Sequence, residues 1–112
     1  MADNPENMEV FNLIARDFGL ERKGADQISY GELLDLIADR VAQMLTTKPE
    51  TLFSLLYRLD VSEKKVDAVM KGGQHALPTN VALAELIIQR QQERLRTKKQ
   101  YRQDKIDGWE RW

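Results

Sequence analysis

The sequence predicts an all-α protein, a single five-helix bundle with a long C-terminal helix whose basic half extends beyond the core. Three observations support this class. Apolar residues recur at helical spacing, capping residues precede several of these segments, and apolar and polar residues alternate nowhere for long, as they would in a half-buried strand. The connecting segments are short, so the helices of this 112-residue chain should share one core.

The helices are bounded by recognisable capping and breaking residues. We expect them over residues 5–18, 30–46, 48–59, 62–71 and 80–88. Ser29 and Glu32 form a capping box at the start of the second helix, and Thr47 and Glu50 repeat that spacing before the third. Gly19 should end the first helix. By the same rules Asn4-Pro5 and Thr79 should begin the first and fifth helices, and Gly72-Gly73 should end the fourth.

The core should form where the apolar stripes of these helices meet. The third helix is so rich in apolar residues that we expect it to be buried on more than one side. The residues expected in the core are Ile14, Phe18, Leu34, Ile37, Val41, Leu52, Leu55, Leu56, Leu59, Leu83 and Ile87. We place this bundle core in residues 1–88 and a basic, tryptophan-containing continuation of the same domain in residues 89–112.

Composition excludes several classes of protein. The chain has no cysteine, which excludes a disulfide scaffold and thiolate metal sites and fits a reducing compartment. No apolar run approaches the ~20 residues that span a bilayer, and the first residues are polar and acidic, unlike a secretory signal. We therefore expect a cytoplasmic protein that does not engage a membrane.

Charge is distributed unevenly along the chain. Residues 1–63 hold six basic and twelve acidic side chains, whereas residues 64–112 hold eleven basic and six acidic ones. Gln89–Lys105 alone holds seven basic and two acidic side chains. Such a chain either balances its own charge or presents a basic arm to an acidic partner.

A ridge of like charge runs along the predicted last helix. The ridge consists of Arg90, Arg94, Lys98 and Arg102. Its members are four residues apart, so they lie on one side of a helix and repel one another by a few tenths of a kcal/mol per pair. The ridge prolongs the face that carries Leu83 and Ile87. We expect this helix to outrun the bundle, or to lay the ridge against an acidic surface of its own chain or of a partner.

The C-terminal tail contains Ile106, Trp109 and Trp112 at three-residue spacing. Tryptophan is enriched at the centres of protein interfaces. The sequence leaves three possibilities open, of which the first is favoured: the tail folds back onto the bundle, it docks onto another chain such as a second copy, or it frays.

Residues 55–70 resemble a helix-turn-helix unit. Its buried positions correspond to Leu55, Leu59, Val61, Val66 and Val69. Leu56 and Asp60 depart from the pattern, which prefers a small residue and a glycine there. The would-be recognition helix offers lysines but also Glu63 and Asp67, and it has no Arg, Asn or Gln for bidentate base contacts. A structural helical pair is therefore favoured over DNA reading.

No catalytic, cofactor or metal site is predicted. The acidic trio Glu32, Asp35 and Asp39 should be a solvated helix face. The only histidine, His75, lies in a glycine-containing loop without a second metal ligand or a nucleophile motif. No enzyme activity and no small-molecule substrate are therefore expected.

The sequence thus favours a non-catalytic protein-binding or assembly module, with a protein partner or a homo-oligomer. The expected contact residues are Arg90, Arg94, Lys98, Arg102, Trp109 and Trp112. The alternative is a nucleic-acid-binding protein that uses the basic arm, the helical pair at residues 52–71, or both.

Overall fold

The fold is all-α, as the sequence predicts. The computed structural model describes residues 5–21, 27–72 and 77–109, with side chains for residues 6–21, 27–72 and 77–100. These residues form five helices and no strand. The helices are α1 (Pro5–Phe18), α2 (Tyr30–Thr47), α3 (Pro49–Arg58), α4 (Glu63–Met70) and α5 (Thr79–Trp109).

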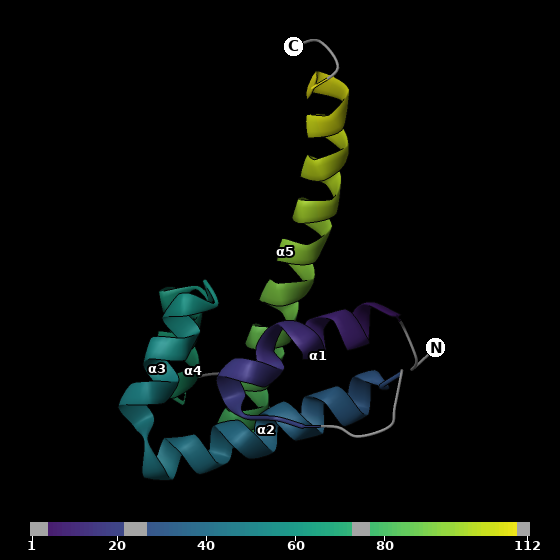
Figure 1. Ribbon diagram of the computed structural model, residues 1–112. Helices are drawn as coiled ribbons and strands as arrows, with labels where there is room; N and C mark the ends of the chain where they lie inside the picture. The colour runs from purple at the N-terminus through teal and green to yellow at the C-terminus, as the bar shows by residue number, and fades with distance from the viewer. Residues whose placement is uncertain (1–4, 22–26, 73–76, 110–112) are drawn as a thin grey trace.

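The first half of α5 is the centre of the bundle. It packs against α1, α2 and α4, while α2 also contacts α1 and α3. Figure 1 shows α3 and α4 together at one end, α1 above α2 beside them, and α5 rising past all four. The long dimension of the molecule, 52 Å against 35 and 25 Å, reflects this projecting helix.

The predicted core residues are buried with one exception. Leu34 is only partly buried and packs against the core from its edge. The core also extends beyond residue 88, because Gln91 is 1% exposed and Leu95 is 8% exposed. The boundary placed at residue 88 therefore falls inside the part of α5 that packs on the bundle.

The start of α2 is built as the sequence predicts. The hydroxyl oxygen of Ser29 accepts a hydrogen bond from the backbone N–H of Glu32 at 3.1 Å. Glu32, Asp35 and Asp39 are all exposed, which is the solvated acidic face expected of this helix.

The predicted caps of α3 and α5 are wrong. Because α2 continues through Thr47, the hydroxyl of that residue donates to the carbonyl of Gln43 at 2.7 Å, and Lys48 precedes α3 without a side-chain cap. In α5 the carbonyl of Pro78 accepts the first helical bond, from the N–H of Ala82, so Thr79 is the first residue of the helix and not its cap.

The expectation that α3 is buried on more than one side is also wrong. Leu52, Leu55 and Leu56 face the core, but Phe53 is 37% exposed and Tyr57 is 74% exposed. Phe53 and Tyr57 therefore lie on the outer surface of α3 and are not part of the core.

Glycines follow two helices where a left-handed residue is needed. Gly19 follows α1 with φ +66°, and Gly72 follows α4 with φ +68°. Both are the stops that the sequence predicts, since this backbone region carries no Cβ penalty for glycine. Asn4, Gly73 and His75 lie outside the described residues.

Candidate functional site

The turn between α3 and α4 is contacted by the first two residues of the ridge, Arg90 and Arg94. The N–H of Asp60 donates to the carbonyl of Tyr57, and the N–H of Val61 donates to that of Leu56, both at 3.0 Å. These two bonds form a Schellman motif, with Asp60 at the left-handed position (φ +64°). The carbonyls of Leu59 and Asp60 remain available for hydrogen bonds from other elements.

Arg90 binds this turn. Its Nε donates to the carbonyl oxygen of Asp60 at 3.0 Å, and its guanidinium pairs with the Asp60 carboxylate at 2.5 Å and with Glu93 at 3.1 Å. The hydrogen bond and charge of Arg90 hold the pKa of Asp60 below its ordinary value, with a smaller contribution from the charge of Arg94. The first member of the ridge is thus engaged within the chain.

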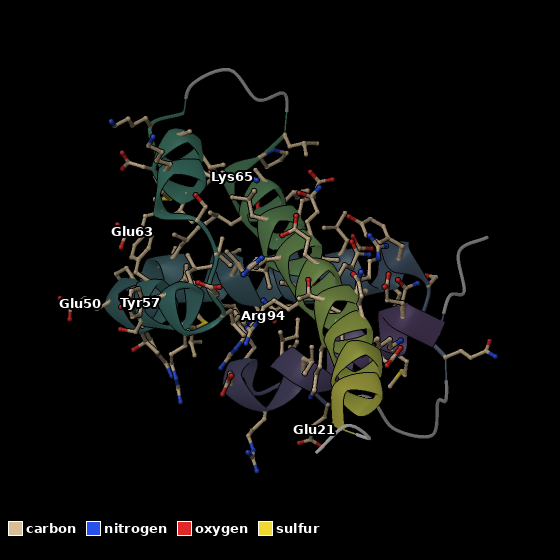
Figure 2. All side chains as sticks on the ribbon, turned by 90° about the horizontal axis from the view of Figure 1, so that it is seen from above. Glu21, Glu50, Tyr57, Glu63, Lys65 and Arg94 are labelled. Carbon is tan, nitrogen blue, oxygen red and sulfur yellow. The ribbon has the colours of Figure 1, made fainter. Side chains whose placement is uncertain are left out.

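Gln91 and Arg94 bind the C-terminal end of α3. The amide nitrogen of Gln91 donates to the carbonyl of Leu59 at 2.9 Å. Arg94 donates to the same carbonyl at 3.2 Å and to the side-chain oxygen of Gln91, also at 3.2 Å. Arg94 accordingly lies between α5 and α3 in Figure 2. These donors satisfy a carbonyl that the helix end leaves unpaired.

Sequence reasoning missed Gln91 as a structural residue. Its signal is a polar side chain between Ile88 and Leu95 on the buried side of α5, where an unpaired amide would be costly. The core-facing side of α5 thus continues through Gln91 and Leu95. Arg90 and Arg94 stand seven residues after Leu83 and Ile87, so the ridge continues the face of these two residues, as the sequence predicts, while the buried side of α5 shifts toward Gln91 and Leu95.

Lys98 lies on a basic surface at the base of the projecting segment. A groove of about 450 Å³ is lined by Arg58 from α3, Leu13 and Asp17 from α1, and Arg94 and Lys98 from α5. Lys98 is exposed. The three cations outnumber the single carboxylate, so this groove is suited to an acidic surface.

Two cations outside the ridge join α5 to α1. Arg96 pairs with both carboxylate oxygens of Glu6, at 3.2 and 3.1 Å, and Lys99 pairs with Glu9 at 3.0 Å. Exposed pairs of this kind each contribute about 0.2–1 kcal/mol. Part of the basic charge of α5 is therefore balanced by acidic residues of α1.

The remaining predicted contact residues lie on the outer part of α5 and beyond it. Arg102 and Trp109 belong to α5 by their backbone, and their side chains are outside the described ones; Trp112 is outside the described residues altogether. As far as Trp109 the backbone contradicts the favoured expectation that the tail folds back, because α5 stays helical to that residue and points away from the bundle (Figure 1).

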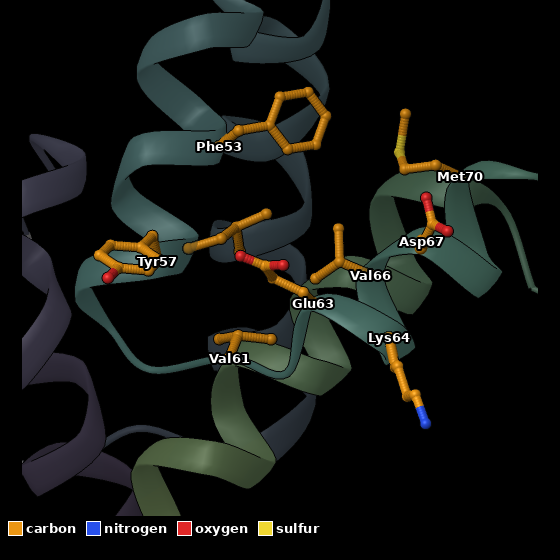
Figure 3. A pocket seen from close by; sticks show the side chains of 9 residues that line it. Phe53, Tyr57, Val61, Glu63, Lys64, Val66, Asp67 and Met70 are labelled. Carbon is orange, nitrogen blue, oxygen red and sulfur yellow. The ribbon is translucent and has the colours of Figure 1, made fainter.

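A second hollow, which sequence reasoning missed, separates α3 from α4. It has a volume of about 650 Å³. Figure 3 shows Phe53 and Tyr57 on its α3 side and Val66 and Met70 on its α4 side. The signal in the sequence is the excess of apolar residues on α3, of which the core covers only a part.

Within the described residues there is no group of three or more acidic, histidine or cysteine side chains that could hold a metal ion. In the same part of the chain no helix has the length and hydropathy needed to cross a membrane. Comparison of the chain with protein-family models, with curated proteins and with solved structures finds no match in any of the three.

Proposed function

We propose that this protein is a non-catalytic binding or assembly module that docks onto a protein through the outer half of α5. The observation that supports this most is the continuation of α5 as a helix through Trp109, past the Lys99–Glu9 pair that is its outermost ion pair among the described side chains. A helix that serves only to complete a bundle has no need of this extension.

Two of the four ridge residues have hydrogen bonds within the chain, and we assign them a different role from the other two. Arg90 and Arg94 hold α5 on the turn between α3 and α4, so their guanidinium groups are partly engaged. Lys98 and Arg102 are the members we assign to direct contact with a partner. Complementary charge favours an acidic protein surface, and the tryptophans at positions 109 and 112 would supply the apolar centre of the interface.

A shortened chain tests this proposal. A chain that ends at Gln100 keeps the contacts of Gln91, Leu95 and Lys99 with the bundle. Full-length and shortened chains would be compared by light scattering for self-association, and by affinity capture from an extract of the native cells with mass spectrometry for other proteins. We expect association only with the full-length chain. Equal results for the two chains would contradict the proposal.

Charge reversal provides a matched pair of variants. Lys98→Glu should weaken any association at least tenfold, because it places a carboxylate where an acidic partner would lie. Lys65→Glu, on the exposed first turn of α4, changes net charge equally and should have no effect. Equal effects of both variants would indicate non-specific electrostatic attraction.

Nucleic-acid binding is the second candidate, and the turn at Asp60 is the observation that favours it. Asp60 has the positive φ of the residue that is usually glycine in a helix-turn-helix, and the five apolar positions of that motif are buried. Against it, α4 has only eight residues and exposes Glu63 and Asp67. Fluorescence anisotropy with labelled mixed-sequence duplex and single-stranded oligonucleotides should then show affinity that falls steeply with salt. Absence of binding at low salt would exclude this candidate.

A further inference from the structure

The basic groove at the base of the projecting segment keeps positive charge that the chain does not balance. This is the groove lined by Arg58 from α3, Leu13 and Asp17 from α1, and Arg94 and Lys98 from α5. Among the described side chains, none of its three cations forms an ion pair. Asp17 is the only carboxylate among the residues that line it. The basic groove therefore has a net positive charge.

The neighbouring cations of α5 are balanced within the chain. Arg90 pairs with Asp60, and Arg96 and Lys99 pair with glutamates of α1. The two α5 cations of the basic groove are on the same helix but have no such partner among the described side chains. The chain thus supplies carboxylates to the first three cations and not to the groove, which favours an acidic occupant from outside.

The groove cations have donors available for such an occupant. Arg94 uses only Nη1 for its bonds to the carbonyl of Leu59 and the side chain of Gln91, both at 3.2 Å. Its Nε and Nη2 have no acceptor among the described residues, and a guanidinium edge of this kind binds a carboxylate through two parallel hydrogen bonds. Arg58 and Lys98 are both exposed.

Apolar side chains share the groove with these charges. Leu13 is 43% exposed, and Leu59 and Leu95 also line the groove. No aromatic side chain is among the lining residues, so the groove lacks the stacking surface on which single-stranded nucleic acid is usually bound. The occupant should therefore combine negative charge with an apolar side chain, as a peptide does and a phosphate backbone does not.

We infer that the basic groove binds a short acidic segment of a partner protein, in which carboxylates flank an apolar side chain. This inference rests on the proposed function, because Lys98 belongs both to the groove and to the docking surface of α5. It extends that surface onto α1 through Leu13 and onto α3 through Arg58. Recognition of acidic segments by clustered arginines is a recurring mode of peptide binding.

Fluorescence anisotropy of the full-length chain with a labelled peptide of glutamates around one leucine tests this inference. We expect saturable binding. Arg58→Glu should weaken it about tenfold, because the new carboxylate would repel those of the peptide. Lys65→Glu changes the net charge equally outside the groove and should have no effect. No binding by the parent chain, or equal losses in the two variants, would overturn the inference.

A second pair of variants tests the apolar part of the groove. The exposed side chain of Leu13 can be replaced without opening the core, and Leu13→Gln should weaken peptide binding about fivefold. Leu77→Gln replaces an apolar side chain of similar exposure (40%) outside the groove and should bind like the parent. Full affinity in Leu13→Gln would show that the groove recognises charge alone. A labelled single-stranded oligonucleotide that displaced the peptide and bound more tightly would also contradict the inference.

A chain that ends at Gln100 separates this inference from the proposed function. It keeps every residue that lines the groove, so it should bind the peptide as well as the full-length chain does. A short peptide held by the groove alone dissociates too readily for affinity capture, so capture of a whole partner should still need the outer half of α5. Capture by the full-length chain without peptide binding would overturn only the inference. Peptide binding with equal capture by both chains would contradict only the proposed function.

Discussion

At the scale of single residues, Asp60 has two roles. It takes the left-handed backbone position of the turn between α3 and α4, and it binds Arg90 of α5. Its left-handed conformation costs an ordinary L-residue about 1–2 kcal/mol, and aspartate tolerates it better than most. Its carbonyl and carboxylate both bind Arg90, at 3.0 and 2.5 Å. A glycine at this position would relieve the backbone but would remove the carboxylate, so the sequence departs from the helix-turn-helix pattern where an ion pair is gained.

The pH dependence of stability should reveal this pair. Arg90 lowers the pKa of Asp60 in the folded chain, so the carboxylate stabilises the fold at pH values above the ordinary pKa of aspartate. This contribution is lost as the pH falls from that value through the lower pKa of the folded state. Asp60→Asn keeps the tolerance for positive φ but removes the charge. We expect this variant to be less stable than the parent at neutral pH and equally stable in strong acid.

Urea unfolding of both chains from neutral pH down to strongly acidic pH measures this difference. The effect should be modest, because Asp60 is exposed and salt screens such pairs. A difference that stays constant across the range would show that the amide disturbs the turn by another route.

At the scale of helices, starts and ends differ in how far the sequence can predict them. The cap of α2 depends on residues three positions apart, and Ser29 and Glu32 form it as predicted. The end of α3 depends on residues about thirty positions away, because Gln91 and Arg94 donate to the carbonyl of Leu59. The end of α1 is similar, since Arg40 donates to the carbonyl of Phe18 at 2.7 Å. No local pattern contains such partners.

Loss of the Gln91 amide should weaken the attachment of α5 to α3. Gln91→Leu removes the 2.9 Å bond to Leu59 and leaves Arg94 without its contact to the amide oxygen. Leucine and glutamine have similar helix propensities, so the loss of about 1–2 kcal/mol in the free energy of unfolding would come from the hydrogen bonds. Chemical denaturation of this variant and of Gln89→Leu, an exposed residue of the same helix, provides the comparison. The second variant should change stability by about 0.5 kcal/mol or less. Similar losses in both would contradict the assigned role of Gln91.

At the scale of the whole molecule, the sequence predicts the all-α class because helical periodicity and composition are repeated along the chain. It identifies the ridge by spacing alone. It cannot identify Arg90 and Arg94 as the ridge residues that hold α5 on the turn, because they meet Asp60 and Leu59 only in the folded chain. The groove between α3 and α4 could not be predicted either, because it also depends on how elements pack in the folded chain. Whether Phe53 and Tyr57 are covered depends on where α4 lies.

The division of α5 into a bound half and a projecting half leads to a prediction about shortened chains. A chain that ends at Gln100 should unfold cooperatively with nearly the thermal midpoint of the full-length monomer, because it keeps Gln91, Leu95 and the pair between Lys99 and Glu9. A chain that ends at Gln89 lacks all of these and should lose several kcal/mol, a large share of the 5–15 kcal/mol typical of a domain. Thermal unfolding followed by circular dichroism, at protein concentrations low enough to keep the chains monomeric, measures both. A chain ending at Gln89 that melted like the full-length protein would show that the core closes without the second half of α5.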